Sequence, residues 1–325
     1  MYTTHVGSFP LDFTRDNVLR VFHDMINIGI DYPPYPQLRN FIKIFLDPLV
    51  DIHVLKLVNS KYVINISLSE LKNLPLPAVR LEEAEIVASI VKKERICVEA
   101  IRGCVTGPFT LASEIQISER ETRGLFTSAL SSKDFVLKYM TRIVREFVTY
   151  LHDVLGFKFI VIDEPVLSVI VGSRRILFDY TIEEISKCLD EVLQGVELAG
   201  VHVCGRVPPL LKDVLLSTRY VKVLDHEFKD NPKNLTVYTK DELEKYDKFI
   251  SFGCVSSRKP VIESVEEIMD VVKRGIDTFG SRLLMIKPDC GFRGLAGFFE
   301  NKEKAYEVAI EKLRRIVEVK RRLHV

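Results

Sequence analysis

The sequence predicts a (β/α)8 TIM barrel, and three observations lead to this fold class. Short apolar runs alternate with amphipathic helical patterns along the 325 residues of the chain. No block of antiparallel hairpins interrupts this alternation, which favours one parallel sheet. Polar side chains that can carry out chemistry follow the apolar runs directly, and a parallel barrel gathers its active site at this end of its strands. A doubly wound open sheet would give similar local patterns, but the strand ends favour the barrel.

The apolar runs are typical of parallel strands that are buried on both faces. In chain order they are THVGSF, IGIDYPPY, ICVEAIRGCV, FKFIVIDEP, LAGVHVC, YVKVLDHEF, KFISFGCV and LLMIKPDCG. Amphipathic patterns predict helices over 12–28, 80–94, 133–155, 182–195, 262–279 and 301–321. Residues 38–80 are longer than one crossover needs. The stretches FIKIFLDPLVDIHVLKL and KYVINISL within them predict an extra helix and a small strand pair on the barrel rim.

Composition indicates an ordinary globular protein: 47% of the residues are hydrophobic, 28% are charged and the net charge is +1. This balance gives no support for nucleic-acid binding. No apolar run approaches the ~20 residues that span a bilayer, and the N-terminus lacks a signal-peptide pattern, so we expect a cytoplasmic protein without a membrane segment. We find no linker or repeat, and therefore expect one domain over 1–325. The sequence leaves the oligomeric state open, a monomer included.

Six scattered cysteines are expected to be thiols, since a chain of this length does not need disulfides for stability. His202 and Cys204 stand two apart at the end of one run, so an extended backbone points both side chains the same way. Cys290 ends another run, and Glu227, or alternatively His226, ends a third. Each residue alone is compatible with core packing or a solvated loop. Together at one barrel face they predict a tetrahedral zinc site.

The charge of this ligand set indicates the reaction. Two thiolates and a carboxylate carry three negative charges against the two positive charges of zinc, so the metal is a poor Lewis acid for activating water. A metal does, however, remove the proton of a bound thiol at neutral pH. The site is therefore better suited to alkyl transfer to a thiol than to hydrolysis.

Two further stretches could bind an amino acid. Asp163 and Glu164 follow a strongly apolar run, where a carboxylate could hold a substrate ammonium. Gly7 and Ser8 could bring backbone N–H groups close to a substrate carboxylate, because Gly7 has no Cβ. A simple strand-to-loop turn explains each stretch equally well, and CVTGPFTL is expected to be a turn.

These motifs resemble the C-terminal catalytic barrel of cobalamin-independent methionine synthases. The resemblance covers essentially the whole chain and rests on TTHVGSFP, RGCVTGPFT, FIVIDEPVL, GVHVC, the glutamate of VLDHEF, and KPDCGFR. It implies a TIM barrel of the methionine synthase and uroporphyrinogen decarboxylase type. It also implies a zinc site made by His202, Cys204, Glu227 and Cys290, and so selects Glu227 over His226. Homocysteine would bind as a thiolate, with its amino group on the catalytic Asp163 and its carboxylate on Val6, Gly7 and Ser8.

Departures from the family pattern indicate a different methyl donor. The folate-using enzymes carry a second, N-terminal barrel, a folate-stacking tryptophan and a D-I-H segment that helps to protonate the departing folate. Here no barrel precedes the motifs, the tryptophan position corresponds to about Glu114, and SSR, residues 256–258, replaces D-I-H. A cob(I)alamin leaving group needs no proton. The chain therefore resembles the short, core form of the enzyme, and methylcobalamin on a corrinoid protein is the expected donor.

One more departure concerns the substrate amino group. The family's H-G-E segment, which supplies a second carboxylate, is replaced by PYPQLRN, where Gln37 could accept a hydrogen bond instead. Three alternatives remain open: a methylcorrinoid:thiol methyltransferase with another acceptor such as coenzyme M, a zinc-free decarboxylase of the uroporphyrinogen type, and a non-catalytic barrel subunit.

Overall fold

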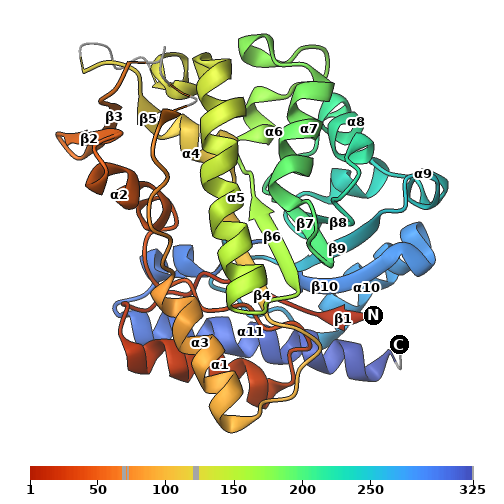
Figure 1. The fold of residues 1–325 in the computed structure, drawn as a ribbon. Coiled ribbons are helices and arrows are strands. Elements are labelled where there is room, and N and C mark those ends of the chain that lie inside the picture. The colour runs from red at the N-terminus through yellow and green to blue at the C-terminus, as the bar shows by residue number, and fades with distance from the viewer. Residues whose placement is uncertain (68–70, 72, 120–123, 324–325) are drawn as a thin grey trace.

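A curled sheet of parallel strands forms the centre of the molecule, which a computed structural model describes over residues 1–67, 71, 73–119 and 124–323 (Figure 1). Within these residues the strands follow the order β1-β10-β9-β8-β7-β6-β4. Their bounds are Tyr2–Thr3 (β1), Arg102–Thr106 (β4), Phe159–Asp163 (β6), Leu198–Val203 (β7), Val223–Glu227 (β8), Phe249–Val255 (β9) and Leu283–Pro288 (β10). Six of these strands overlap predicted runs, and β1 directly precedes the run THVGSF, residues 4–9. The α/β barrel prediction is therefore confirmed.

The gap between β1 and β4 is closed by residues 32–37, which come from the predicted run IGIDYPPY and its continuation. The prediction of a regular strand there is wrong. In place of a ladder, the segment forms isolated bridges, Thr4 to Tyr32 and Ser8 to Gln37 on one side and Pro34 to Arg102 on the other. Three prolines in PPYP have no N–H to donate, so a continuous ladder cannot form.

Helices cover the outside of the sheet. Their bounds are Arg15–Ile28 (α1), Lys43–Asp51 (α2), Glu82–Glu94 (α3), Pro108–Ser113 (α4), Thr141–Thr149 (α5), Leu167–Ile170 (α6), Ile182–Leu193 (α7), Pro209–Ser217 (α8), Lys240–Lys245 (α9), Val265–Phe279 (α10) and Lys302–Arg322 (α11). π-helical turns at Phe135–Met140 and Tyr150–Val154 extend α5 at both ends, so the predicted helix over 133–155 is confirmed to within a few residues. Helices α1, α3 and α11 lie together at the base of the view in Figure 1.

Side-chain caps explain where several helices begin. Thr181, Thr239 and Ser264 each accept a hydrogen bond from the backbone N–H three residues on, and the glutamate there bonds back to the cap. Such capping boxes satisfy N–H groups that the first turn leaves without partners. Helix α1 ends at Gly29, whose φ of 95° is left-handed and suits glycine.

Residues 38–80 contain the expected helix and strand pair. Helix α2 is followed by the antiparallel strands β2 (Leu55–Val58) and β3 (Lys61–Ile64). Strand β5 (Ile115–Gln116) joins β3 in parallel, which the sequence did not predict. Leu68, the last residue of KYVINISL, lies outside the described residues, as do residues 69, 70 and 72.

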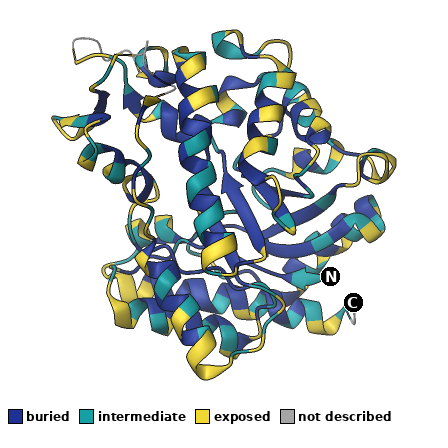
Figure 2. Ribbon diagram, viewed as in Figure 1, coloured by how far each residue is buried: buried dark blue, intermediate teal, exposed yellow. Residues whose placement is uncertain are grey.

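The buried apolar residues form two clusters. The large one lies between the sheet and its helices, and Figure 2 shows strands of the central sheet, such as β6, as buried. The small one consists of Phe159, Val161, Val223 and Met285, with tyrosines 2 and 32 packed against it. Since Phe159 and Val223 begin their strands, this cluster fills the barrel at the amino ends of the strands and leaves the carboxyl ends for polar groups. In the described part of the chain, no helix has both the length and the apolar character needed to cross a membrane.

Candidate metal centre

Three predicted ligands meet at the carboxyl ends of β7 and β10. The atoms His202 Nε2, Cys204 Sγ and Cys290 Sγ all lie within 4.8 Å of one another. His202 Nε2 is 3.1 Å from Cys204 Sγ, which is 3.3 Å from Cys290 Sγ. Strand alternation places His202 and Cys204 on the same side, and β10 delivers Cys290 from 86 residues away along the chain.

The donor set suits zinc in both type and spacing. Zinc accepts imidazole nitrogen and thiolate sulfur, and tetrahedral ligands at about 2.0 to 2.3 Å from the metal lie roughly 3.5 to 3.8 Å apart. The separations in this structure, 3.1 and 3.3 Å, are a few tenths of an ångström shorter. Small side-chain adjustments would therefore admit the ion.

The two thiols differ in acidity. A hydrogen bond from Cys204, together with the His202 imidazole, holds the pKa of Cys290 well below the ordinary thiol value. Conversely, the bond to Cys290 and burial raise the pKa of Cys204. One thiolate is thus already favoured in the pair, and a metal would have to remove the proton of the second.

Asp225 orients His202. Its Oδ1 lies 2.7 Å from His202 Nδ1, and both side chains are buried. Lys287 Nζ contacts the same carboxylate at 2.8 Å and Arg102 Nη1 at 2.9 Å. Burial alone raises the pKa of Asp225, but these cations more than offset it and hold the pKa well below the usual range. A carboxylate on Nδ1 fixes the ring and leaves Nε2 facing the sulfur of Cys204.

This role of Asp225 was not predicted from the sequence. Asp225 and Glu227 are two residues apart on one strand, so alternation places both on the same side as His202. The spacing D-x-E next to H-x-C was the available signal. No sequence pattern indicated the roles of Arg102 and Lys287. Both pair with Asp225, which lies far from them along the chain.

Glu227 is buried beside the cluster but is bonded elsewhere. Its Oε1 accepts a hydrogen bond from Arg258 Nη2 at 2.8 Å, and its Oε2 accepts one from Asn231 Nδ2. The cluster of ligand atoms within 4.8 Å of one another contains His202, Cys204 and Cys290 but not Glu227.

His226 points away from this site. Its Nε2 lies 3.1 Å from the Tyr238 hydroxyl, and the two rings stack. Burial lowers the pKa of His226 to about 3, so the ring is a neutral core histidine. The alternation along β8 separates His226 from Glu227 and leaves Glu227 as the member of this pair that faces the cluster.

Asp289, next to Cys290, shapes the neighbouring loop. Its carboxylate accepts hydrogen bonds from the backbone N–H groups of Phe228, Lys229 and Asp230 at 2.7 to 3.1 Å. Through these bonds the P-D-C-G turn holds the residues that follow Glu227. Burial raises the pKa of Asp289 to about 7.

Asp163 has the only carboxylate oxygen among the buried, unpartnered side-chain atoms of the described residues. It ends β6 and is in register with His202 on β7. Burial raises the pKa of Asp163 to about 7, although the His202 and Arg102 charges oppose the shift. An ammonium group placed at Oδ1 would satisfy this oxygen.

Its neighbour Glu164 has a different role. The Glu164 carboxylate accepts hydrogen bonds from Phe109 N, Thr110 N and Thr110 Oγ1, all at 2.7 to 2.9 Å, and so caps α4. A Cβ on Gly107 would lie only 2.2 Å from Glu164 Oε1. The stretch CVTGPFTL is therefore more than a turn, because Gly107 provides the space in which this anchor forms.

The residues predicted to bind the substrate carboxylate, Val6, Gly7 and Ser8, lie on the segment after β1. Val6 is buried, and Gly7 has a left-handed φ of 111°. The Gly7 N–H donates to His5 Nδ1 at 3.0 Å and is therefore already engaged within the chain. A Cβ on Gly291 would lie 1.9 Å from Ser8 Oγ, so glycine there allows the loop of Cys290 to approach this segment closely.

Gln37 lies beside this segment. Its backbone N–H donates to Gly7 O at 2.9 Å. The side-chain Nε2 donates to Tyr35 Oη and to Cys104 O, which orients the amide oxygen towards Gly7. This oxygen is the atom that was expected to accept a hydrogen bond from a substrate.

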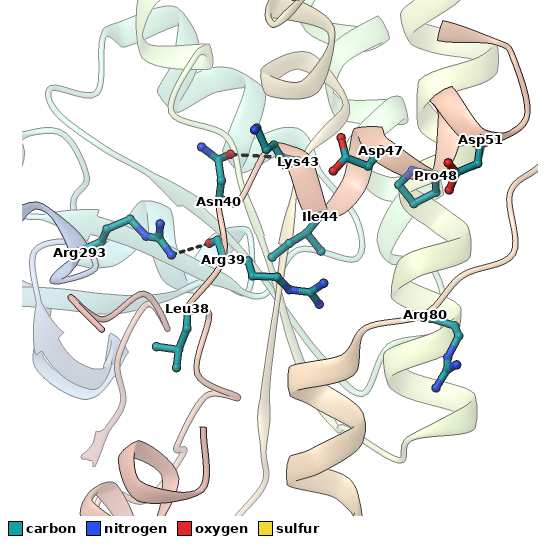
Figure 3. Close-up of a pocket in the computed structure, with 10 residues that line it drawn as sticks. All are labelled: Leu38, Arg39, Asn40, Lys43, Ile44, Asp47, Pro48, Asp51, Arg80 and Arg293. Atoms are coloured by element: carbon teal, nitrogen blue, oxygen red, sulfur yellow. Dashed lines mark hydrogen bonds between the residues drawn. The ribbon is translucent and has the colours of Figure 1, made fainter. Parts of the chain in front are cut away.

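A separate pocket of about 360 Å³ lies outside the metal cluster (Figure 3). None of the predicted site residues lines it. Its arginines are partly neutralised by carboxylates, since Arg39 pairs with Glu83 and Arg80 with Glu85. Arg293 Nη2 donates to the Arg39 carbonyl at 2.6 Å, which ties the loop after β10 to the start of residues 38–80.

Solved structures share this fold. A B12-independent methionine synthase from Shewanella sp. W3-18-1, solved with selenomethionine, superposes with a TM-score of 0.69 over 99% of this chain and 98% of that one, at 16% identity. A methyltransferase from Methanosarcina mazei gives a TM-score of 0.65 over 96% and 86%, also at 16% identity.

Sequence relatives point to the same family. Methionine synthase of Methanocaldococcus jannaschii is 28% identical over 98% of both chains. Methionine synthase of Methanothermobacter thermautotrophicus is 32% identical over 60% of this chain and 57% of that one. The family model described as the catalytic domain of cobalamin-independent synthase matches residues 76–321. The chain therefore belongs to the cobalamin-independent methionine synthase family.

Proposed function

We propose that this protein transfers a methyl group to the thiol of homocysteine, with zinc bound by His202, Cys204, Cys290 and Glu227. The observation that carries the proposal is the nitrogen and sulfur cluster next to the unsatisfied Oδ1 of Asp163. One group of atoms suits a metal that binds sulfur, and the other suits an ammonium. Homocysteine carries both a thiol and an ammonium.

Zinc would supply the acidity that keeps the substrate sulfur deprotonated and nucleophilic at neutral pH. The residues of the chain orient the reactants. Asp225 fixes the His202 ring, and Asp289 holds the loop after Glu227. Most of the rate would come from positioning and from the thiolate, because the electron-rich ligand set does not favour attack by water.

Asp163 and Ser8 would bind the amino-acid part of the substrate. The Asp163 carboxylate would accept hydrogen bonds from the ammonium, and Ser8 would donate to the carboxylate, with Gln37 as a neutral acceptor nearby. This division favours homocysteine over coenzyme M. A sulfonate acceptor without an ammonium would leave Asp163 Oδ1 unsatisfied, and an unsatisfied buried polar group costs about 1 to 3 kcal/mol.

A methylated corrinoid protein is the proposed methyl donor. The chain has no tryptophan to stack on a folate. Residues 256–258 offer two serines and an arginine where a general acid would be needed, and the arginine is bonded to Glu227. A corrinoid leaves without a proton, so neither feature hinders it.

The barrel rim is compatible with docking of a protein donor. Among the described residues, six exposed large apolar side chains lie on segments between the end of a strand and the next barrel helix: Phe41, Leu57, Phe126, Val169, Val261 and Phe298. These segments surround the mouth of the barrel. They offer apolar contacts on the side of the barrel that a docked donor would face.

Zinc analysis combined with a donor and acceptor screen tests the proposal. We expect one zinc per chain, and methionine formation from homocysteine with methylcobalamin but not with methyltetrahydrofolate. Coenzyme M serves as the competing acceptor. Protein that binds no zinc, or that methylates coenzyme M in preference to homocysteine, would contradict the proposal.

A further inference from the structure

Arg258 reaches from the loop after β9 to the carboxylate of Glu227. The Arg258 side chain is 59% exposed and that of Glu227 is fully buried, and their charged atoms are 2.8 Å apart. Asn231 Nδ2 bonds the other carboxylate oxygen. Both oxygens of Glu227 therefore have donors that do not belong to the metal cluster.

The loop that carries Arg258 is fixed by buried contacts. Ser256 N donates to Glu263 Oε1 at 2.8 Å, and the buried Lys312 holds the same glutamate at 2.6 Å. The Ser256 hydroxyl donates to Asp230 Oδ2 at 2.6 Å and accepts from Arg258 N at 3.2 Å. The guanidinium thus reaches Glu227 from a rigid base, which reduces the conformational entropy lost when the ion pair forms.

Charge balance gives this ion pair a consequence for the metal. Two thiolates and a carboxylate around zinc sum to one negative charge, and a substrate thiolate would add another. Arg258 is a permanent cation near Glu227, Cys204 and Cys290. Arg258 therefore gives the Glu227 carboxylate a second possible partner at the edge of the cluster. Without this partner the carboxylate would remain bound to the metal.

We infer that Arg258 is a positioning residue that competes with zinc for the Glu227 carboxylate, so that a substrate thiolate can take the fourth coordination position. The inference rests on the proposed zinc site and extends it. The contact that carries this role is the charge-assisted hydrogen bond from Arg258 to Glu227. It would hold the carboxylate when the substrate thiolate replaces it on zinc.

Replacing Arg258 tests this competition in two directions. In Arg258→Met, Glu227 loses its cationic partner and binds the metal more strongly. We expect zinc to bind roughly tenfold more tightly and homocysteine roughly tenfold more weakly, which is the lower end of the contribution of one hydrogen bond to a charged group. Arg258→Lys keeps a cation and should lie between the variant and the natural protein. Lys259→Met is the matched control, because it removes a neighbouring exposed cation that is 3.9 Å from Asp230.

The measurements are zinc affinity by chelator competition, and the visible spectrum of the cobalt-loaded protein during titration with homocysteine. Opposite shifts in the two affinities, with Lys259→Met unchanged, support the inference. Equal affinities in Arg258→Met and Lys259→Met, or weaker zinc binding in Arg258→Met, overturn it. If the inference is overturned but the natural protein binds one zinc and transfers methyl groups, the proposed function still stands. If the natural protein binds no zinc, both the inference and the proposed function fail.

Discussion

The carboxyl end of the barrel has two halves that differ in how completely their polar groups are paired. On β7 and β8, His202, Asp225 and Glu227 each have specific partners that fix their orientation. On β6, Asp163 keeps a buried oxygen without a partner. The half proposed to bind zinc is thus preorganised by contacts within the chain, whereas the half proposed to bind the amino acid has an acceptor that a substrate would have to satisfy.

The same contrast appears between two consecutive residues. Glu164 has three hydrogen bonds from the start of α4, and Asp163 Oδ1 has none. Burial raises the pKa of both carboxyl groups to about 7. Glu164 is thus an anchor for the loop, whereas Asp163 Oδ1 is the oxygen to which we propose that a substrate ammonium binds.

The largest effect should come from removing a ligand in the metal half. In Cys290→Ser we expect zinc content to fall to near zero and methyl transfer to fall by more than about a thousandfold, because both need the same thiolate. Metal analysis and a methylcobalamin assay measure this. Cys97→Ser removes an exposed thiol and should change neither quantity. A Cys290→Ser protein with stoichiometric zinc would refute the assignment of this ligand.

A smaller effect, confined to the other half, is expected for Asp163→Asn. Loss of the carboxylate should raise the KM for homocysteine roughly a hundredfold, since a buried charge-assisted hydrogen bond is lost. Zinc content should stay at one per chain. A thiol acceptor without an amino group should be methylated equally well by both proteins. If zinc content fell together with homocysteine affinity, the two halves would not be independent.

The pH dependence sharpens the same comparison. Burial raises the pKa of Asp163 from 3.8 to about 7, and only the ionised form attracts an ammonium. Homocysteine binding should therefore weaken as the pH falls below 7, by up to about tenfold per pH unit. Homocysteine binding to Asp163→Asn should not show this pH dependence. Binding of an acceptor without an amino group to the natural protein should not show it either. If the pH profile of binding were the same for homocysteine and for the acceptor without an amino group, a group other than Asp163 would be responsible for the titration.

The smallest effect is expected from the anchor beneath Asp163. In Gly107→Ala the new Cβ would lie 2.2 Å from Glu164 Oε1 and displace the carboxylate from its donors. We expect a loss of about 1 to 3 kcal/mol in the free energy of unfolding, the cost of leaving buried groups unpaired. Denaturant unfolding measures this loss. Gly297→Ala, where a Cβ would contact nothing within 4 Å, is the control, and an equal loss in both would disprove the anchor.

Much of the fold was predictable because it depends on local patterns. Alternation of apolar runs and helical stretches predicted the barrel, and capping residues such as Thr181 and Ser264 explain where helices begin. Residues 32–37 were predicted less well. Their apolar character suggested a strand, but the prolines prevent the ladder and leave only bridges.

The sequence by itself determined which side chains share a face, because a strand repeats every two residues. This places His202 with Cys204 and separates Glu227 from His226 whatever the rest of the chain does. Only the tertiary structure decided the partners: Asp225 for His202, Arg258 for Glu227, and α4 for Glu164. These contacts join residues that are 23, 31 and 55 positions apart. Periodicity along one strand carries no information about such pairs, since they depend on how separate elements pack.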